Sequence, residues 1–184
     1  MTVFVSLLRA INVGGRGTIR MTALADLYRA QGFDSVTTVL QSGSVVFSTR
    51  LRSAARIADM IGEAIEEAFV FRPVVVMRTA DQLRDIIARN PFAGRTDVAP
   101  GRLVVMFLDG TPARCAEEAL TAAYRGEEDI HLRGSEVFIH YVNGIGRSKL
   151  TGAVLERALG VKGTARNWNT VTKLAEVAAR IGAR

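Results

Sequence analysis

The sequence predicts an α+β fold made of two βαββαβ subdomains in tandem. Three observations indicate this class: short apolar runs of strand length, intervening segments with helical spacing, and a repeat of the same order after residue 100. The 184 residues are 48% hydrophobic and 23% charged, which is the composition of a globular domain with enough apolar side chain to bury a core. No apolar run approaches the ~20 residues that span a bilayer, so no membrane insertion is expected.

The first subdomain is expected at residues 1–78, and each of its elements has a local signal. Strands are indicated by the apolar or β-branched runs, helices by apolar residues three to four apart, and a hairpin by the small polar loop 41–44. Gly32 is expected to close the first helix. The predicted elements are a strand at 3–8, a helix with Leu24, Leu27 and Tyr28, strands at 36–40 and 45–48, a helix with Ile57, Ile61, Ile65 and Phe69, and a strand at 73–77.

Residues 79–100 are expected to hold a linking helix at 80–89 and a loop, and residues 101–184 a second subdomain. In the second subdomain Thr111 and Pro112 are expected as the N-cap and first residue of a helix, and Gly134-Ser135 as a two-residue hairpin turn. The predicted elements are strands at 103–108, 130–132, 137–139 and 161–164, a helix at 150–159, and a C-terminal helix with Val171, Leu174, Ala178 and Ile181. The βαββαβ order is that of the ferredoxin-like split unit.

In that arrangement the loop after the first strand and the loop of the first hairpin emerge at the same end of the sheet. The sequence therefore predicts that residues 12–17 lie beside residues 41–44. Loops that gather at one end of a rigid sheet are a usual place for function.

The formal net charge of +6 is confined to two segments. Residues 1–25 contain three arginines and no acid, and residues 145–173 contain six basic residues against Glu156, whereas the other 130 residues have a net charge of −2. The basic excess thus favours a local anion site over a uniformly basic surface.

The first basic segment contains a glycine loop, Gly14-Gly15-Arg16-Gly17, between a strand and a helix. Its backbone N–H groups are suited to a phosphate, with charge from Arg9 or Arg16. The loop has neither the Walker spacing nor a complete G-x-G-x-x-G, so a crossover that needs glycine for its backbone conformation is the alternative interpretation.

The second basic segment contains Thr164-Ala-Arg-Asn-Trp-Asn-Thr170 at the expected start of the last helix. Asn167 or Asn169 is expected as the N-cap, while Trp168 or Arg166 is able to stack on a base. The alternative is a capped helix anchored by a half-buried Trp168.

Other chemistry has weak support. Ser148-Lys149 lacks the spacing of Ser-x-x-Lys enzymes, and Cys115 is expected to be a small apolar residue. Asp129, His131 and His140 are expected on one face of a hairpin, but cross-strand diagonal neighbours do not readily share a metal. Neither a metal nor a cofactor is expected.

Several motifs occur together along the chain: Leu7-Leu-Arg-Ala-Ile-Asn-Val-Gly-Gly15, Gln41-Ser-Gly-Ser-Val-Val-Phe47, Asn90-Pro-Phe92, Ser148-Lys-Leu-Thr151 and Thr164-Ala-Arg-Asn-Trp-Asn-Thr-Val171. In this order and spacing they resemble the bacterial family catalogued as domain of unknown function 1697. The resemblance implies a small cytoplasmic α+β protein of two subdomains, and it carries over no activity, cofactor or catalytic residue. The family usually has Gly where this chain has Ala10 and Asn where it has Ser44.

The leading hypothesis is a cytoplasmic binding module for a phosphate-bearing ligand, either an anionic small molecule such as a nucleotide or a nucleic acid. A transferase acting on an anionic substrate and a structural or protein-interaction module are the alternatives. No membrane partner is expected, and the protein is expected to be a monomer or a homodimer. The expected ligand-binding residues are Arg9, Asn12, Gly14, Gly15, Gln41, Ser42, Lys149, Arg166, Asn167, Trp168, Asn169 and Thr170.

Overall fold

The computed structural model describes residues 1–12 and 18–183. These residues form two compact units, which we call the first unit (1–85 with 172–184) and the second unit (86–171). Each unit is an α+β assembly with one four-stranded antiparallel sheet, as the sequence predicts. The grouping differs from the predicted ranges 1–78, 79–100 and 101–184 mainly at the C-terminal helix, most of which belongs to the first unit.

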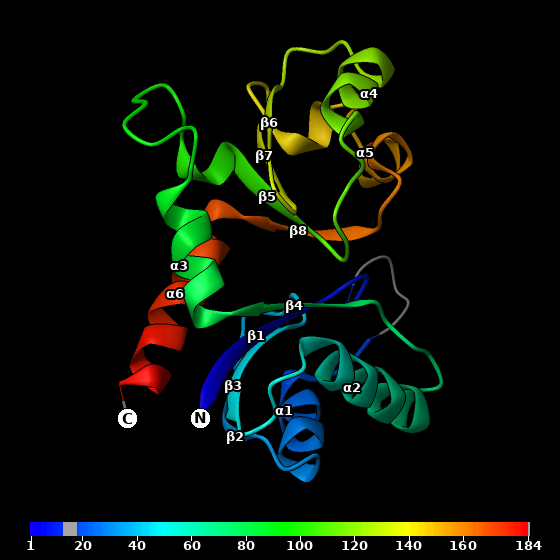
Figure 1. The fold of residues 1–184 in the computed structure, drawn as a ribbon, viewed down its shortest axis with the longest axis vertical. Coiled ribbons are helices and arrows are strands. Elements are labelled where there is room, and N and C mark those ends of the chain that lie inside the picture. The colour runs from blue at the N-terminus through cyan, green and yellow to red at the C-terminus, as the bar shows by residue number, and fades with distance from the viewer. Residues whose placement is uncertain (13–17, 184) are drawn as a thin grey trace. The chain divides into compact units, whose positions relative to one another are not determined.

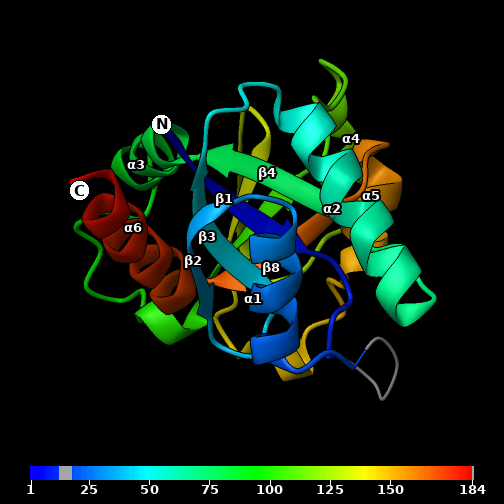
Figure 2. The same ribbon diagram turned by 90° about the horizontal axis from the view of Figure 1, so that it is seen from below.

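The first unit has the expected βαββαβ order, and its strands pair in the order β2-β3-β1-β4. Figures 1 and 2 show α1 and α2 on the same side of this sheet. The elements are β1 (Thr2–Leu8), α1 (Met21–Ala30), β2 (Asp34–Val39), β3 (Ser44–Thr49), α2 (Ala54–Phe69) and β4 (Val75–Thr79).

The core of the first unit joins α1 to the sheet through aromatic rings. Phe47 of β3 stacks on Phe33 with ring centroids 4.6 Å apart, and Tyr28 of α1 meets Phe47 edge-on at 5.4 Å. The buried Tyr28 hydroxyl lies 2.8 Å from Ser6 Oγ on β1, so the polar end of this side chain has a partner inside the core.

The second unit repeats the order, and its strands pair as β6-β7-β5-β8. Figure 1 shows α4 and α5 on one side of this sheet. The elements are β5 (Leu103–Leu108), α4 (Ala116–Ala123), β6 (Asp129–Arg133), β7 (Glu136–His140), α5 (Gly152–Leu159) and β8 (Gly163–Asn167). Arg133 pairs with Glu136, which leaves Gly134 (φ +66°) and Ser135 as the predicted two-residue turn.

Four further elements complete the chain: α3 (Ala80–Ala88), η1 (Pro100–Arg102), η2 (Ile145–Arg147) and α6 (Trp168–Gly182). The boundaries between the two units fall inside α3 and α6. No helix in the described part of the chain is both long enough and apolar enough to span a membrane.

Two local predictions are wrong. Thr111 does not cap a helix, because α4 begins only at Ala116, after Cys115, and the segment between contains no helix. The last strand lies at 163–167 and not at 161–164, because residues up to Asn167 pair with β5. Arg166 therefore lies on a strand, whereas the sequence placed it at a helix start.

Candidate functional site

The first half of the predicted site lies where β1 ends. Asn12 uses its side-chain amide at three points: its Oδ1 accepts a hydrogen bond from Ile19 N (2.8 Å), and its Nδ2 donates to Ile19 O (3.1 Å) and Gln41 O (3.1 Å). This confirms the prediction that Asn12 lies beside the β2–β3 turn. The bonds to Ile19 hold together the two ends of the glycine and arginine segment that follows β1.

Residues 13–17, which include the predicted Gly14 and Gly15, lie outside the described part of the chain. The neighbouring β2–β3 turn holds Gln41 and Ser42. Gln41 is exposed, and Ser42 Oγ lies 3.1 Å from the buried Ser44 Oγ. Half-buried Arg9 directly follows β1, and its N–H donates to Val74 O (2.9 Å).

Helix α1 begins at this same end of the sheet, and its N-terminus differs from those of the other α-helices. Its N-cap residue is Arg20, no side chain caps it, and its first turn contains no acidic residue. The caps or first-turn acids of the other helices are Ser53 for α2, Thr79 for α3, Glu117 and Glu118 for α4, Thr151 for α5 and Asn167 for α6. The first amides of α1 thus present the positive end of a helix dipole without a side-chain cap or a first-turn acid.

Arg166, in the second half of the predicted site, is buried on β8. Its guanidinium donates to Thr164 Oγ1 and to Ala165 O, each at 2.8 Å. Burial lowers the pKa of Arg166 to about 10, so the side chain remains a cation at neutral pH. Two hydrogen bonds of this buried cation thus lie within its own strand.

The residues after Arg166 connect β8 to α6. Asn167 Oδ1 accepts from Asn169 N (3.0 Å) and its Nδ2 donates to Gly101 O (2.9 Å), so Asn167 is the predicted cap. Half-buried Trp168 lies 6.4 Å from Phe138 between ring centroids, and Thr170 is buried. These contacts match the alternative of a capped helix anchored by Trp168.

Lys149 is exposed and follows Ser148, which the sequence did not assign to a polar cluster. Glu128 accepts hydrogen bonds from Tyr124 and Ser148, and these bonds lower the pKa of Glu128 against the effect of burial. Burial is the main cause that raises the pKa of Tyr124, and it raises the pKa of nearby Tyr141 to about 12. The pattern Ser148-Lys149 gave no signal for Tyr124 or Glu128, which lie at least 20 residues earlier in the chain.

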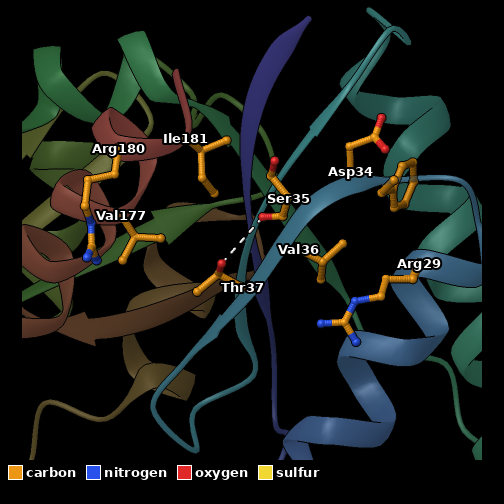
Figure 3. A pocket seen from close by; sticks show the side chains of 9 residues that line it. Arg29, Asp34, Ser35, Val36, Thr37, Val177, Arg180 and Ile181 are labelled. Carbon is orange, nitrogen blue, oxygen red and sulfur yellow. Dashed lines mark hydrogen bonds between the residues drawn. The ribbon is translucent and has the colours of Figure 1, made fainter. Parts of the chain in front are cut away.

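A hollow of about 690 Å³ lies astride the edge strand β2 and contains none of the predicted site residues. Figure 3 shows Ser35 and Thr37 on the side of β2 that faces α6, and Val36 with Arg29 on the other side. The hollow is also lined by three residues of α6, Val177, Arg180 and Ile181. Arg29 is already paired with Asp26 at 2.6 Å.

Asp129, His131 and His140 lie on one face of the β6–β7 hairpin, and Ile130, Leu132, Val137 and Ile139 pack into the core on the other, as predicted. Within residues 1–12 and 18–183, no group of three or more His, Cys, Asp or Glu side chains has a geometry suited to a metal ion.

The two halves of the predicted site belong to different units. In the first unit the structure brings Asn12 to Gln41, and in the second it brings Asn167 to Asn169. Arg20 is a basic residue at the first half that the predicted site omitted. Its signal in the sequence was its place just before the helix that carries Leu24 and Tyr28.

Together these features define a protein of two βαββαβ units with polar motifs at the ends of their sheets. The chain belongs to the family described as protein of unknown function (DUF1697), whose model matches residues 1–138.

The chain is similar over 96% of its length to a solved structure, that of the conserved bacterial protein SP0830 from Streptococcus pneumoniae, of which it covers 98%. The two are 18% identical, with a TM-score of 0.71. This likeness supports the fold. None of the curated proteins matches the chain.

Proposed function

We propose that the end of the first sheet binds a phosphate-bearing ligand, either a nucleotide or a nucleic acid. The observation that carries the proposal is the three-point bonding of Asn12, which holds the ends of the glycine and arginine segment next to the β2–β3 turn. The positive end of α1 lies directly after Ile19, without a side-chain cap.

The charge distribution supports the same ligand class. Arg9 and Arg20 flank the segment, Arg16 lies within it, and the first acidic residue of the chain is Asp26. Glycine-rich segments in proteins often present backbone N–H groups to phosphate oxygens. The fixed dipoles of the backbone and the charge of the arginines are both expected to stabilise a bound phosphate here.

Titration calorimetry with inorganic phosphate, ATP and a short single-stranded oligonucleotide tests this proposal. Binding of at least one of these is expected to weaken steeply between ~50 and ~200 mM salt, as charge-driven phosphate binding does. At the same salt concentration, Arg20→Ala is expected to bind the probe more weakly than the wild-type protein does. Arg56→Ala, at an exposed position of α2, is the control because it removes the same charge from another part of the unit.

A second experiment locates the binding. In Asn12→Ala the protein is expected to bind the phosphate probe more weakly while both sheets remain folded, as judged by circular dichroism. If no probe binds at low salt, or if Arg56→Ala weakens binding as much as Arg20→Ala, the proposed function is wrong.

A structural role is the second candidate for residues 164–170. It is favoured by Arg166 and Asn167, whose side-chain hydrogen bonds link β8, η1 and the start of α6 inside the second unit. On this interpretation Arg166→Ala sharply lowers the melting temperature, whereas a ligand-binding role alone leaves the melting temperature unchanged.

A further inference from the structure

Residues 90–99, which we call the strap, form an exposed loop in the second unit with one buried side chain. Asn90 Oδ1 accepts a hydrogen bond from Phe92 N (3.0 Å), and Ala93 N donates to Asn90 O (3.2 Å). This turn directs Phe92, only 4% exposed, onto the polar face of the β6–β7 hairpin. The Asn90-Pro-Phe92 motif therefore serves to seat one aromatic ring.

The ring of Phe92 packs on two histidines. It meets His131 of β6 with centroids 5.2 Å apart and His140 of β7 at 6.0 Å, both edge-on. His131 is one-third exposed and lies 3.0 Å from Asp129, whereas His140 is only 4% exposed. Neither ring nitrogen of buried His140 has a hydrogen-bond partner among the described residues.

A second contact holds the strap through Arg95. Its guanidinium lies 2.5 Å from Asp97 and 2.6 Å from Asp129 of β6, and 5.4 Å from the centroid of the Phe92 ring. The hydrogen bond from Arg95 lowers the pKa of Asp97 to about 2, and the same contact raises that of Arg95. Both groups are therefore charged at every pH at which an imidazole titrates.

We propose that the strap is an acid-released device: it closes over neutral His140 and loosens when His140 takes up a proton. The physical reason is the cost of burying an unpaired charge, which far exceeds that of burying a neutral imidazole. An open strap gives the protonated ring access to water.

The charged groups that face His140 belong to the same contact that holds the strap. Arg95 and Asp97 lie on the strap and Asp129 and His131 on β6, while the β5 residue opposite His140 is apolar Leu103. The strap carboxylate Asp97 attracts a protonated His140, because His140 lowers the pKa of Asp97 through its charge. Asp97 or Asp129 can neutralise His140 only by giving up part of its bond to Arg95, and this weakens a contact that holds the strap.

The direction of the pH dependence follows from linkage. The open state binds the proton more readily than the closed state, so closure is favoured above the ordinary imidazole range near pH 6.5. As the pH falls through that range, the ratio of closed to open protein falls by up to ~10-fold for each pH unit.

Limited trypsin digestion tests the proposal, because Arg95 is a cleavage site within the strap. The rate of cleavage after Arg95 is divided by that after exposed Arg114, which cancels the pH dependence of trypsin itself. From pH 7.5 to 5.5 this ratio is expected to rise about tenfold in the wild-type protein. His140→Phe, which keeps an aromatic ring but cannot titrate, is expected to show a constant ratio.

His131→Gln is the matched control, since it removes the other histidine under Phe92 and is expected to retain the rise. A constant ratio in the wild type, or an equal rise in His140→Phe, overturns the proposal. Should His140→Phe fail to fold, amide hydrogen exchange of residues 92–97 in the wild type provides the test. Corrected for intrinsic rates, exchange there must accelerate at pH 5.5 relative to β7, and an unchanged ratio also overturns the proposal.

Discussion

At the scale of single residues, backbone strain gathers at the end of the first sheet. Among the described residues, five other than glycine have positive φ, and four of these, Ala10, Asn12, Leu40 and Val70, lie in the segments that join elements at this end. Such conformations are costly and persist where the surrounding contacts enforce them.

Gly43 shows the same constraint in a form that is directly testable. Its φ is +66°, and a Cβ there would lie 3.0 Å from Ile11 Cβ and 3.1 Å from Leu8 Cβ. Gly43→Ala is expected to lower the free energy of unfolding by about 1 kcal/mol or more beyond the loss in Gly94→Ala, measured by urea denaturation. Gly94 is the control because its φ is +79° and nothing lies within 4 Å of an added Cβ. Equal losses in the two variants would contradict this packing argument.

At the scale of elements, Asn167 joins three parts of the second unit. It ends β8, caps α6 and bonds to the carbonyl of Gly101 in η1. Because it caps α6, the helix end that the sequence offered to an anion already has an acceptor.

Asn167→Ala is therefore expected to cost ~1 kcal/mol for the cap, with a further loss for the bond to Gly101. Asn167→Asp keeps the acceptor but not the donor, and is expected to lose less. Thr151→Ala, which removes only the cap of α5, serves as the comparison in the same denaturation experiment. A smaller loss in Asn167→Ala than in Thr151→Ala would argue against this role.

At the scale of the whole molecule, the chain returns to its first unit after completing the second. Residues 172–184 group with residues 1–85, and Val177 of α6, only 5% exposed, lines the hollow beside Ser35 and Thr37 of β2 (Figure 3). The end of the chain thus contributes to burial in a sheet formed by its beginning.

A chain that ends at Val171 is expected to lose this cover. Amide exchange in β2 should accelerate and a dye for exposed apolar surface should bind, although the deleted residues are over 130 positions from β2. Lys173→Ala, an exposed change on the same helix, is expected to leave both signals unchanged. Unaltered exchange in β2 after truncation would contradict the assignment of α6 to the first unit.

Local patterns predicted most of the architecture. The apolar or β-branched runs and the helical spacings placed the elements of both βαββαβ units, and Gly134 marked the turn of the second hairpin. Thr111-Pro112 misled because a favourable cap dipeptide does not decide where a helix begins. The last strand was misplaced because Thr164 to Asn167 are polar or small, and only their pairing with β5 makes them a strand.

The candidate site was predicted as a set of segments but not as a set of contacts. The sequence by itself determined the order of elements, the two basic segments and the approach of Asn12 to the β2–β3 turn, because these depend on periodicity, charge and strand direction. The tertiary structure alone decided that Arg166 is buried, that Asn167 bonds to a carbonyl 66 residues away, and that His140 lies beneath Phe92. Hydrogen bonding and burial depend on neighbours in space, and neighbours that are distant in sequence leave no local pattern.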